Sequence, residues 1–123
     1  MLFTALFTAL LTAAWRDFRV APDFVASLSV VGVDGTGKRW LSSSPSRGWI
    51  RVKTGTLDGT TTLAGYAGAP GRAPVAFAIL FNELPRASAA KAKQLQYKLA
   101  ESIALHIASP DRSLPTAGTT ARP

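Results

Sequence analysis

The residues best suited to chemistry in this sequence stand side by side in a strand-like segment. They are Lys53, Thr54, Gly55 and Thr56. In an extended strand the side chains of Lys53 and Thr54 point to opposite faces, because successive side chains alternate. Gly55 leaves a gap in which another backbone can approach closely. An ammonium group and two hydroxyls beside that gap predict a cradle for a peptide with a terminal carboxylate, whose backbone could pair with the strand.

The sequence around this cradle predicts a small antiparallel sheet covered by helices. Residues 49–54 alternate between two faces, as in a half-buried strand, and residues 75–82 form an apolar run of strand length. Short connections favour an antiparallel meander. The predicted fold class is therefore α+β, with three strands at 48–56, 60–67 and 75–82 and with helices at 2–15, 22–28 and 86–108.

Each of the two long helices has an apolar stripe that predicts its packing face. In the first helix the stripe consists of Leu2, Leu6, Ala9, Leu10 and Ala13, with Phe3, Phe7 and Leu11 beside it. In the last helix it consists of Ala92, Leu95, Leu99, Ile103 and Ile107. Trp40 and Trp49 are interpreted as packing residues, and Asp34 and Asp58, which precede glycines, as turn residues.

Positive charge is concentrated just before and within the cradle. The chain has 14 basic and 7 acidic residues, a net charge of +7. The segment 38–53 has no acidic residue and carries Lys38, Arg39, Arg47, Arg51 and Lys53. Such a cluster raises the local concentration of anions, such as a carboxylate, an anionic cell-wall polymer or a nucleic acid. A non-catalytic basic binding module is therefore an alternative function, although no recognised nucleic-acid motif is present and no nucleic-acid partner is expected.

Several kinds of site are excluded or disfavoured by composition and spacing. The chain has no cysteine and one histidine, His106, so no metal or cofactor is predicted. The glycines between Gly32 and Lys38 do not have the spacing of a phosphate-binding loop. The apolar N-terminal segment has no basic residue before Arg16 and is shorter than the ~20 residues of a membrane span. A packed helix is the main interpretation of that segment, and a cleaved or anchoring segment is the alternative.

Three segments together resemble one enzyme family. They are APDFVASLSVVGVDGT at 21–36, GWIRVKTGTLDGTTTLAGYAG at 48–68 and VAFAILFN at 75–82. In this order and spacing they resemble the C-terminal part of the D-alanyl-D-alanine carboxypeptidase/endopeptidase family, the class C low-molecular-mass penicillin-binding proteins. Lys-Thr-Gly is the third signature motif of such penicillin-recognising serine enzymes. The resemblance extends over residues 5–108.

The resemblance implies a role for each residue of the cradle. Lys53 would be catalytic, aiding proton movement and attracting the terminal carboxylate of the substrate. Thr54 and Thr56 would offer hydroxyls to that carboxylate, and Gly55 would leave room for the substrate. The backbone N–H of Thr56 would be one of two oxyanion-hole donors. The implied ligands are peptidoglycan stem peptides ending in D-Ala-D-Ala and β-lactams, in the periplasm or cell envelope.

Two departures from the family pattern concern catalysis. No Ser-x-x-Lys precedes Lys53, and the Ser-x-x-Lys at Ser88–Lys91, which follows it, is interpreted as a coincidence. No Ser-x-Asn is present. Since an acyl-enzyme requires an activated nucleophile, we expect a C-terminal fragment that is inactive alone. Residues 1–108 would form this part of the domain, and residues 109–123 a disordered tail.

The resemblance also implies an exposed sheet edge. The family's sheet has two further strands beside the one that corresponds to residues 75–82. Without them this apolar strand would have an unpaired edge, and self-association through that edge is expected.

Overall fold

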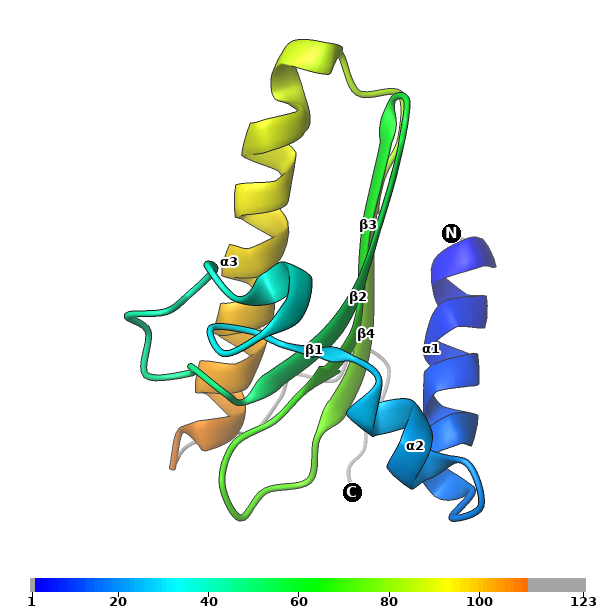
Figure 1. Ribbon diagram of the computed structural model, residues 1–123, viewed down its shortest axis with the longest axis vertical. Helices are drawn as coiled ribbons and strands as arrows, with labels where there is room; N and C mark the ends of the chain where they lie inside the picture. Colours follow the sequence, from blue (N-terminus) through cyan, green and yellow to red (C-terminus); the bar gives the residue numbers. More distant parts are fainter. Residues whose placement is uncertain (1, 111–123) are drawn as a thin grey trace.

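The chain folds into a twisted antiparallel sheet with helices on both faces (Figure 1). The computed structural model describes residues 2–110. The strands lie in the order β1-β2-β3-β4, and their bounds are β1 (Ser29–Val30), β2 (Ile50–Leu57), β3 (Thr60–Ala67) and β4 (Val75–Phe81). The predicted α+β class is confirmed, as are its three predicted strands to within two residues at each end. The predicted strand count is wrong by one, because β1 joins the sheet.

The short strand β1 lies in a segment whose glycines predict only a turn. Its two residues pair with the start of β2, Ser29 opposite Val52 and Val30 opposite Arg51. A turn holds it there, because the Asp34 carboxylate accepts a hydrogen bond from the Val30 N–H at 2.8 Å. The turn role predicted for Asp34 is therefore confirmed. Two residues are too short to show the alternation that reveals a strand.

The hairpin of β2 and β3 carries the predicted cradle. Its register runs from Ile50 opposite Ala67 to Leu57 opposite Thr60. Gly59 closes the two-residue turn with a φ of +74°, a conformation that glycine adopts without a steric penalty. Gly65 allows the two strands to approach, because a Cβ built there would lie 1.9 Å from the Arg51 carbonyl oxygen.

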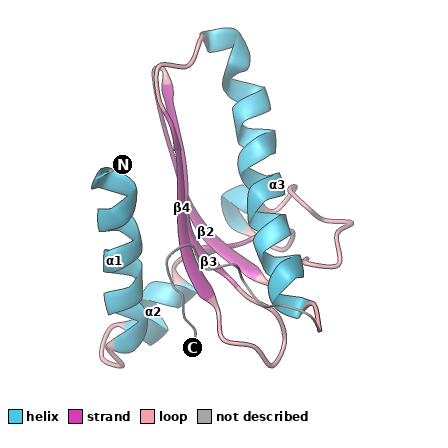
Figure 2. Ribbon diagram, turned by 180° about the vertical axis from the view of Figure 1, so that it is seen from behind, coloured by secondary structure: helices cyan, strands magenta, loops and turns pink. Residues whose placement is uncertain are grey.

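Helices cover the two faces of the sheet separately (Figure 2). On one face lie α1 (Leu2–Arg16), which packs mainly against β4, and the short α2 (Ala21–Ala26). On the other lies α3 (Ala89–Ala108). Two single 3-10 turns, η1 (Gly35–Gly37) and η2 (Arg86–Ser88), precede β2 and α3. The predicted helix at 86–108 thus begins as a 3-10 turn.

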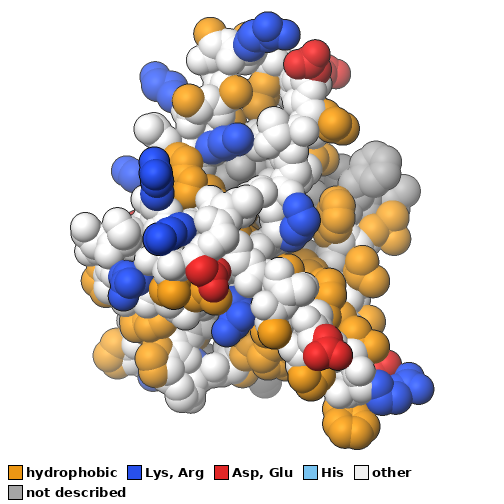
Figure 3. All heavy atoms as spheres, viewed as in Figure 1, with side chains coloured by type: hydrophobic (Ala, Val, Ile, Leu, Met, Phe, Trp, Pro, Cys, Tyr) orange, Lys and Arg blue, Asp and Glu red, His pale blue; other side chains and the backbone are white. Residues whose placement is uncertain are grey.

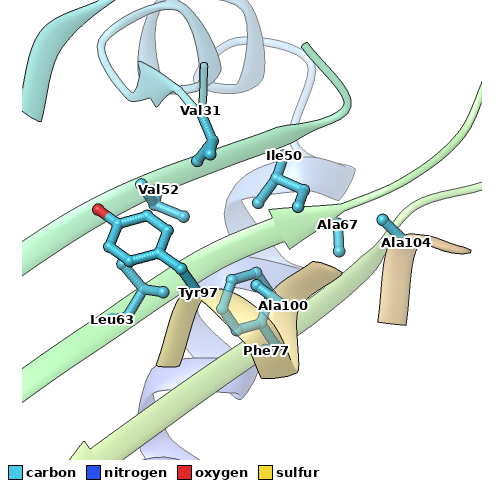
Figure 4. Packing of buried hydrophobic residues seen from close by; sticks show 9 residues of the cluster. All are labelled: Val31, Ile50, Val52, Leu63, Ala67, Phe77, Tyr97, Ala100 and Ala104. Carbon is cyan, nitrogen blue, oxygen red and sulfur yellow. The ribbon is translucent and has the colours of Figure 1, made fainter. Parts of the chain in front are cut away.

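The main hydrophobic core lies between the sheet and α3 (Figure 4). Ala100 and Ala104 are fully buried against it, and their small side chains bring the helix close to the strands. The predicted stripe of α3 is partly wrong, because Leu95 and Leu99 are 47% and 41% exposed. The buried face is shifted around the helix and consists of Ala92, Gln96, Tyr97, Ala100, Ala104 and Ile107.

The packing face predicted for α1 is also wrong. Leu6 and Leu10 are 57% and 63% exposed, whereas Leu11 is buried. The Tyr66 hydroxyl donates a hydrogen bond to the Leu11 carbonyl oxygen at 2.6 Å and fixes this side of the helix to β3. Threonines can be half-buried on α1 because their hydroxyls donate to carbonyls of the preceding turn, as Thr12 does to Thr8 at 2.8 Å.

Two predictions concern the ends of the chain. Of the predicted tail at 109–123, residues 111–123 lie outside the described residues. Within residues 2–110, no helix combines the length and the apolar character that crossing a membrane requires.

Candidate functional site

The four residues of the predicted cradle lie in β2, as the sequence predicts. Lys53 and Thr56 are exposed, and Thr54 and Gly55 are half-buried. The Lys53 ammonium donates a hydrogen bond to the Thr54 carbonyl oxygen at 2.7 Å. Both groups lie near the surface. An anion can therefore replace the Thr54 carbonyl as the partner of the Lys53 ammonium, and no buried charge has to be exposed.

One edge of β2 is open beside the cradle. β1 pairs only with Arg51 and Val52, so the strand on that side stops before Lys53. From Lys53 to Leu57, β2 has a strand neighbour on the β3 side only, within the part of the chain that the structure describes. Backbone N–H and C=O groups on such an edge can pair with an added peptide strand.

The side chains of the cradle lie on opposite faces of β2. Lys53 lines a groove of about 360 Å³ together with Ser27 and Asp34, on the side of α2. Thr54 lines a cavity on the side of α3, and Thr56 lines a second one nearby. A single ligand can therefore reach Lys53 and the hydroxyls only by lying along the open edge.

The gap left by Gly55 is filled from the neighbouring strand. Thr62 lies opposite Gly55 in the hairpin register. A Cβ built on Gly55 would lie 2.6 Å from the Thr62 hydroxyl oxygen. Thr62 therefore bounds the space that the resemblance assigns to the substrate. The sequence analysis did not name Thr62, although the register of a two-residue hairpin indicates that it lies opposite Gly55.

The basic residues near the cradle do not form one free patch. Arg47 donates to the Gly32 carbonyl at 3.0 Å, and Arg51 donates to the Val25 carbonyl at 3.2 Å. With Lys53, three of the five cations of segment 38–53 donate to backbone carbonyls. Figure 3 shows Lys and Arg side chains scattered over the visible face with apolar side chains between them. The structure therefore supports a general polyanion-binding surface less strongly than the clustering of these cations in the sequence does.

α3 supplies residues near the cradle that the sequence did not single out. Tyr97 stacks on Trp40 with ring centroids 4.5 Å apart, which confirms the packing role predicted for Trp40. Burial raises the pKa of the Tyr97 phenol above its ordinary value. Gln96 donates to the carbonyls of Thr61 and Ile79, each at 3.1 Å. Only the packed structure reveals these residues, because they lie far from β2 in sequence.

Comparison with known proteins assigns the family. The family model of the D-Ala-D-Ala carboxypeptidase 3 (S13) family matches residues 4–104. The matched span contains the whole sheet and most of α1 and α3. The chain belongs to the D-Ala-D-Ala carboxypeptidase 3 (S13) family. Its resemblance to D-alanyl-D-alanine carboxypeptidases is thereby confirmed, while no curated protein matches the chain.

The literal Ser-x-x-Lys of this S13-family chain lies where η2 meets α3, and Arg86 and Ala89 beside Ser88 line the cavity of Thr56. Ser88 ends η2, and Lys91 is an exposed residue in the first turn of α3. Neither residue lines the cavities that contain Thr54 or Thr56. The interpretation of the motif as a coincidence stays a prediction.

Proposed function

We propose that this chain forms the substrate-binding wall of a serine-type D-Ala-D-Ala carboxypeptidase/endopeptidase. The observation that carries the proposal is the open edge of β2 from Lys53 to Leu57, in a chain of the S13 family. The substrate is a peptidoglycan stem peptide ending in D-Ala-D-Ala, which adds to this edge as a strand. β-Lactams bind in its place, and the setting is the cell envelope.

Each residue of the cradle has a distinct part in this proposal. The ammonium of Lys53 leaves the Thr54 carbonyl and attracts the peptide carboxylate. The hydroxyls of Thr54 and Thr56 donate to that carboxylate. The N–H of Thr56 donates to the oxyanion, and the loss of one such donor costs about 10²–10³ in turnover. Gly55 has no side chain and leaves room for the substrate.

The nucleophile and its base come from outside the 123 residues. Cleavage transfers the acyl group of the penultimate D-Ala to a serine, releases the terminal D-Ala, and ends with hydrolysis of the ester by water. The serine must be activated by an adjacent base, and this sequence has no Ser-x-x-Lys ahead of Lys53. The chain alone therefore binds ligand and does not turn it over.

The outer edge of β4 provides a second contact surface in this proposal. Of the described strands, β4 pairs only with β3, and it begins at the exposed Val75. An apolar edge of this kind favours strand addition. We propose that two copies of the chain associate through it.

Fluorescent penicillin tests the proposed function. We expect no covalent label on a denaturing gel but reversible binding by fluorescence anisotropy. Lys53→Gln should weaken that binding about tenfold, because a charge-assisted contact is lost, whereas the exposed Lys91→Gln should not. A covalent label would place the nucleophile in this chain and would make Ser88 a candidate for it. Absence of penicillin binding together with retardation of duplex DNA at physiological salt would favour the basic binding module instead.

A further inference from the structure

A small cavity lies behind the cradle, between β2 and α3. Its volume is about 170 Å³. The sheet contributes Thr54 to its wall, the segment after β1 contributes Thr36 and Trp40, and α3 contributes Lys93 and Tyr97. Three parts of the chain that are distant in sequence thus meet at one threonine of the cradle.

One residue of the cavity wall, Tyr97, has an unused hydrogen-bond donor. Tyr97 is 3% exposed, and its hydroxyl has no hydrogen-bond partner within the described residues 2–110. Figure 4 shows this hydroxyl pointing past Val52 and Leu63, away from the rings and methyl groups of the core. Buried hydroxyls are nearly always hydrogen-bonded, and leaving one without a partner is costly. An acceptor for Tyr97 would have to come from a group that binds against this wall.

The other groups in the cavity wall indicate the chemistry of that acceptor. The amide nitrogen of Gln96 donates to two carbonyls, and its oxygen lies 3.5 Å from the Thr61 hydroxyl that donates to it. The remaining lining residues with polar side-chain groups are Thr36, Trp40, Thr54, Thr62, Tyr97 and the half-buried Lys93. Among residues 2–110, no acidic residue lines the cavity. A wall of donors with one cation fits a small carboxylate.

Lys93 links this cavity to the second threonine of the cradle. The adjacent cavity, of about 300 Å³, is lined by Thr56 and also by Lys93. No ion pair is present at Lys93 among residues 2–110. One free cation of α3 therefore faces the side of β2 that carries both hydroxyls.

We propose that Lys93 and Tyr97 complete a carboxylate site on the α3 side of β2. The site receives the C-terminal carboxylate of the bound peptide through Thr54, so its ligand is identified on the basis of the proposed function. Lys93 supplies the charge of this site, and Tyr97 supplies a fixed donor from the core.

Titrations of the full chain with N-acetyl-D-alanyl-D-alanine and with its C-terminal amide, followed by NMR, test this proposal. We expect the acid to shift the signals of Thr36, Thr54 and Tyr97, and the amide to bind at least about tenfold more weakly. Lys93→Gln should weaken binding of the acid by about the same factor and leave the amide unaffected. Lys98→Gln, an exposed change on the same helix, should alter neither. Tyr97→Phe, checked for folding by circular dichroism, should also weaken binding of the acid.

Three results would overturn the carboxylate site alone. They are equal binding of the acid and the amide, unchanged binding by Lys93→Gln, and shifts confined to the edge from Lys53 to Thr56. Equal binding of the acid and the amide would mean that the cavity holds only water. Shifts confined to the edge from Lys53 to Thr56 would leave the proposed function intact. If the unmodified chain bound neither peptide, the carboxylate site and the proposed function would both fail.

Discussion

At the scale of single residues, two glycines of the hairpin have different structural roles. A Cβ at Gly65 would overlap the Arg51 backbone carbonyl, whereas a Cβ at Gly55 would meet only the end of the Thr62 side chain. Backbone in a paired strand cannot move aside, but a threonine can change rotamer. The tolerance of β2 and β3 for a methyl group therefore differs sharply between these positions.

The first prediction compares alanine at these two glycines. Gly65→Ala should lower the free energy of unfolding by about 3 kcal/mol or prevent folding, because overpacking against backbone cannot relax. Gly55→Ala should cost about 1 kcal/mol or less, since Thr62 can rotate. Urea denaturation followed by circular dichroism measures both changes. Equal losses of stability would show that the strands do not approach closely at Gly65.

The second prediction concerns alkaline pH. Burial raises the pKa of Tyr97 above its ordinary value of 10.0, so the unfolded chain ionises this phenol first as the pH rises. The stability associated with the neutral phenol is fully present below pH 10 and is lost above it. Tyr97→Phe should reduce the fall in stability between pH 9 and 11, measured by urea denaturation at each pH, compared with the unmodified chain. An unchanged pH dependence would contradict this account.

At the scale of elements, α3 is held to the sheet by one buried amide as well as by apolar contacts. Gln96 is 1% exposed and joins α3 to both β3 and β4 through its amide nitrogen. An amide in this position fixes how far the helix is rotated about its own axis. This explains why the helix presents alanines to the core and leaves Leu95 and Leu99 partly exposed.

The third prediction removes this amide. Gln96→Leu should lower the free energy of unfolding by about 2 kcal/mol, because it removes hydrogen bonds to the Thr61 and Ile79 carbonyls in a buried site. Gln94→Leu, an exposed change two residues away on the same helix, should change it by about 0.5 kcal/mol or less. Chemical denaturation measures both. If Gln96→Leu left the free energy of unfolding unchanged, apolar packing alone would orient α3.

The elements were largely predictable from the sequence, but their packing faces were not. Apolar runs and turn residues predict β2, β3, β4 and the long helices, because these signals are local. The stripe of Leu6 and Leu10 predicts an apolar side of α1, but the structure covers the side of Leu11. The difference comes from Tyr66, which is 55 residues away in sequence and bonds to the helix backbone. Long-range contacts of this kind leave no trace in the periodicity.

The same reasoning applies to the candidate site. Lys53 to Thr56 were predicted because they are contiguous and lie in a strand. The position of Thr62 opposite Gly55 follows from the register of the two-residue hairpin. The contributions of Lys93 and Tyr97 depend on the rotation of α3, so no spacing in the sequence indicates them. β1 was missed because two residues show no pattern, although it decides where the open edge of β2 begins.

At the scale of the whole molecule, apolar surface remains exposed on several elements. It includes Leu6 and Leu10 of α1, Leu95 and Leu99 of α3, and Val75 at the start of the free edge of β4. Apolar patches and free strand edges promote association. Association in solution is therefore the expected behaviour of this chain.

The fourth prediction assigns this association to the edge of β4. The unmodified chain should form dimers as its concentration rises, measured by size-exclusion chromatography with light scattering. Val75→Lys should weaken dimerisation several-fold, because a charge on an edge strand opposes strand pairing. Val20→Lys, which changes an exposed valine before α2, should not. A monomer at all concentrations, or equal effects of the two changes, would contradict association through β4.

The central claim is that the open edge of β2 accepts a D-alanyl-D-alanine peptide as an added strand. Amide hydrogen exchange of the full chain with and without N-acetyl-D-alanyl-D-alanine tests it most directly. The claim predicts slower exchange for edge amides between Lys53 and Leu57 when the peptide is bound, with no change in β4. Protection that is absent from this edge at saturating peptide, or that appears in β4 instead, would contradict it.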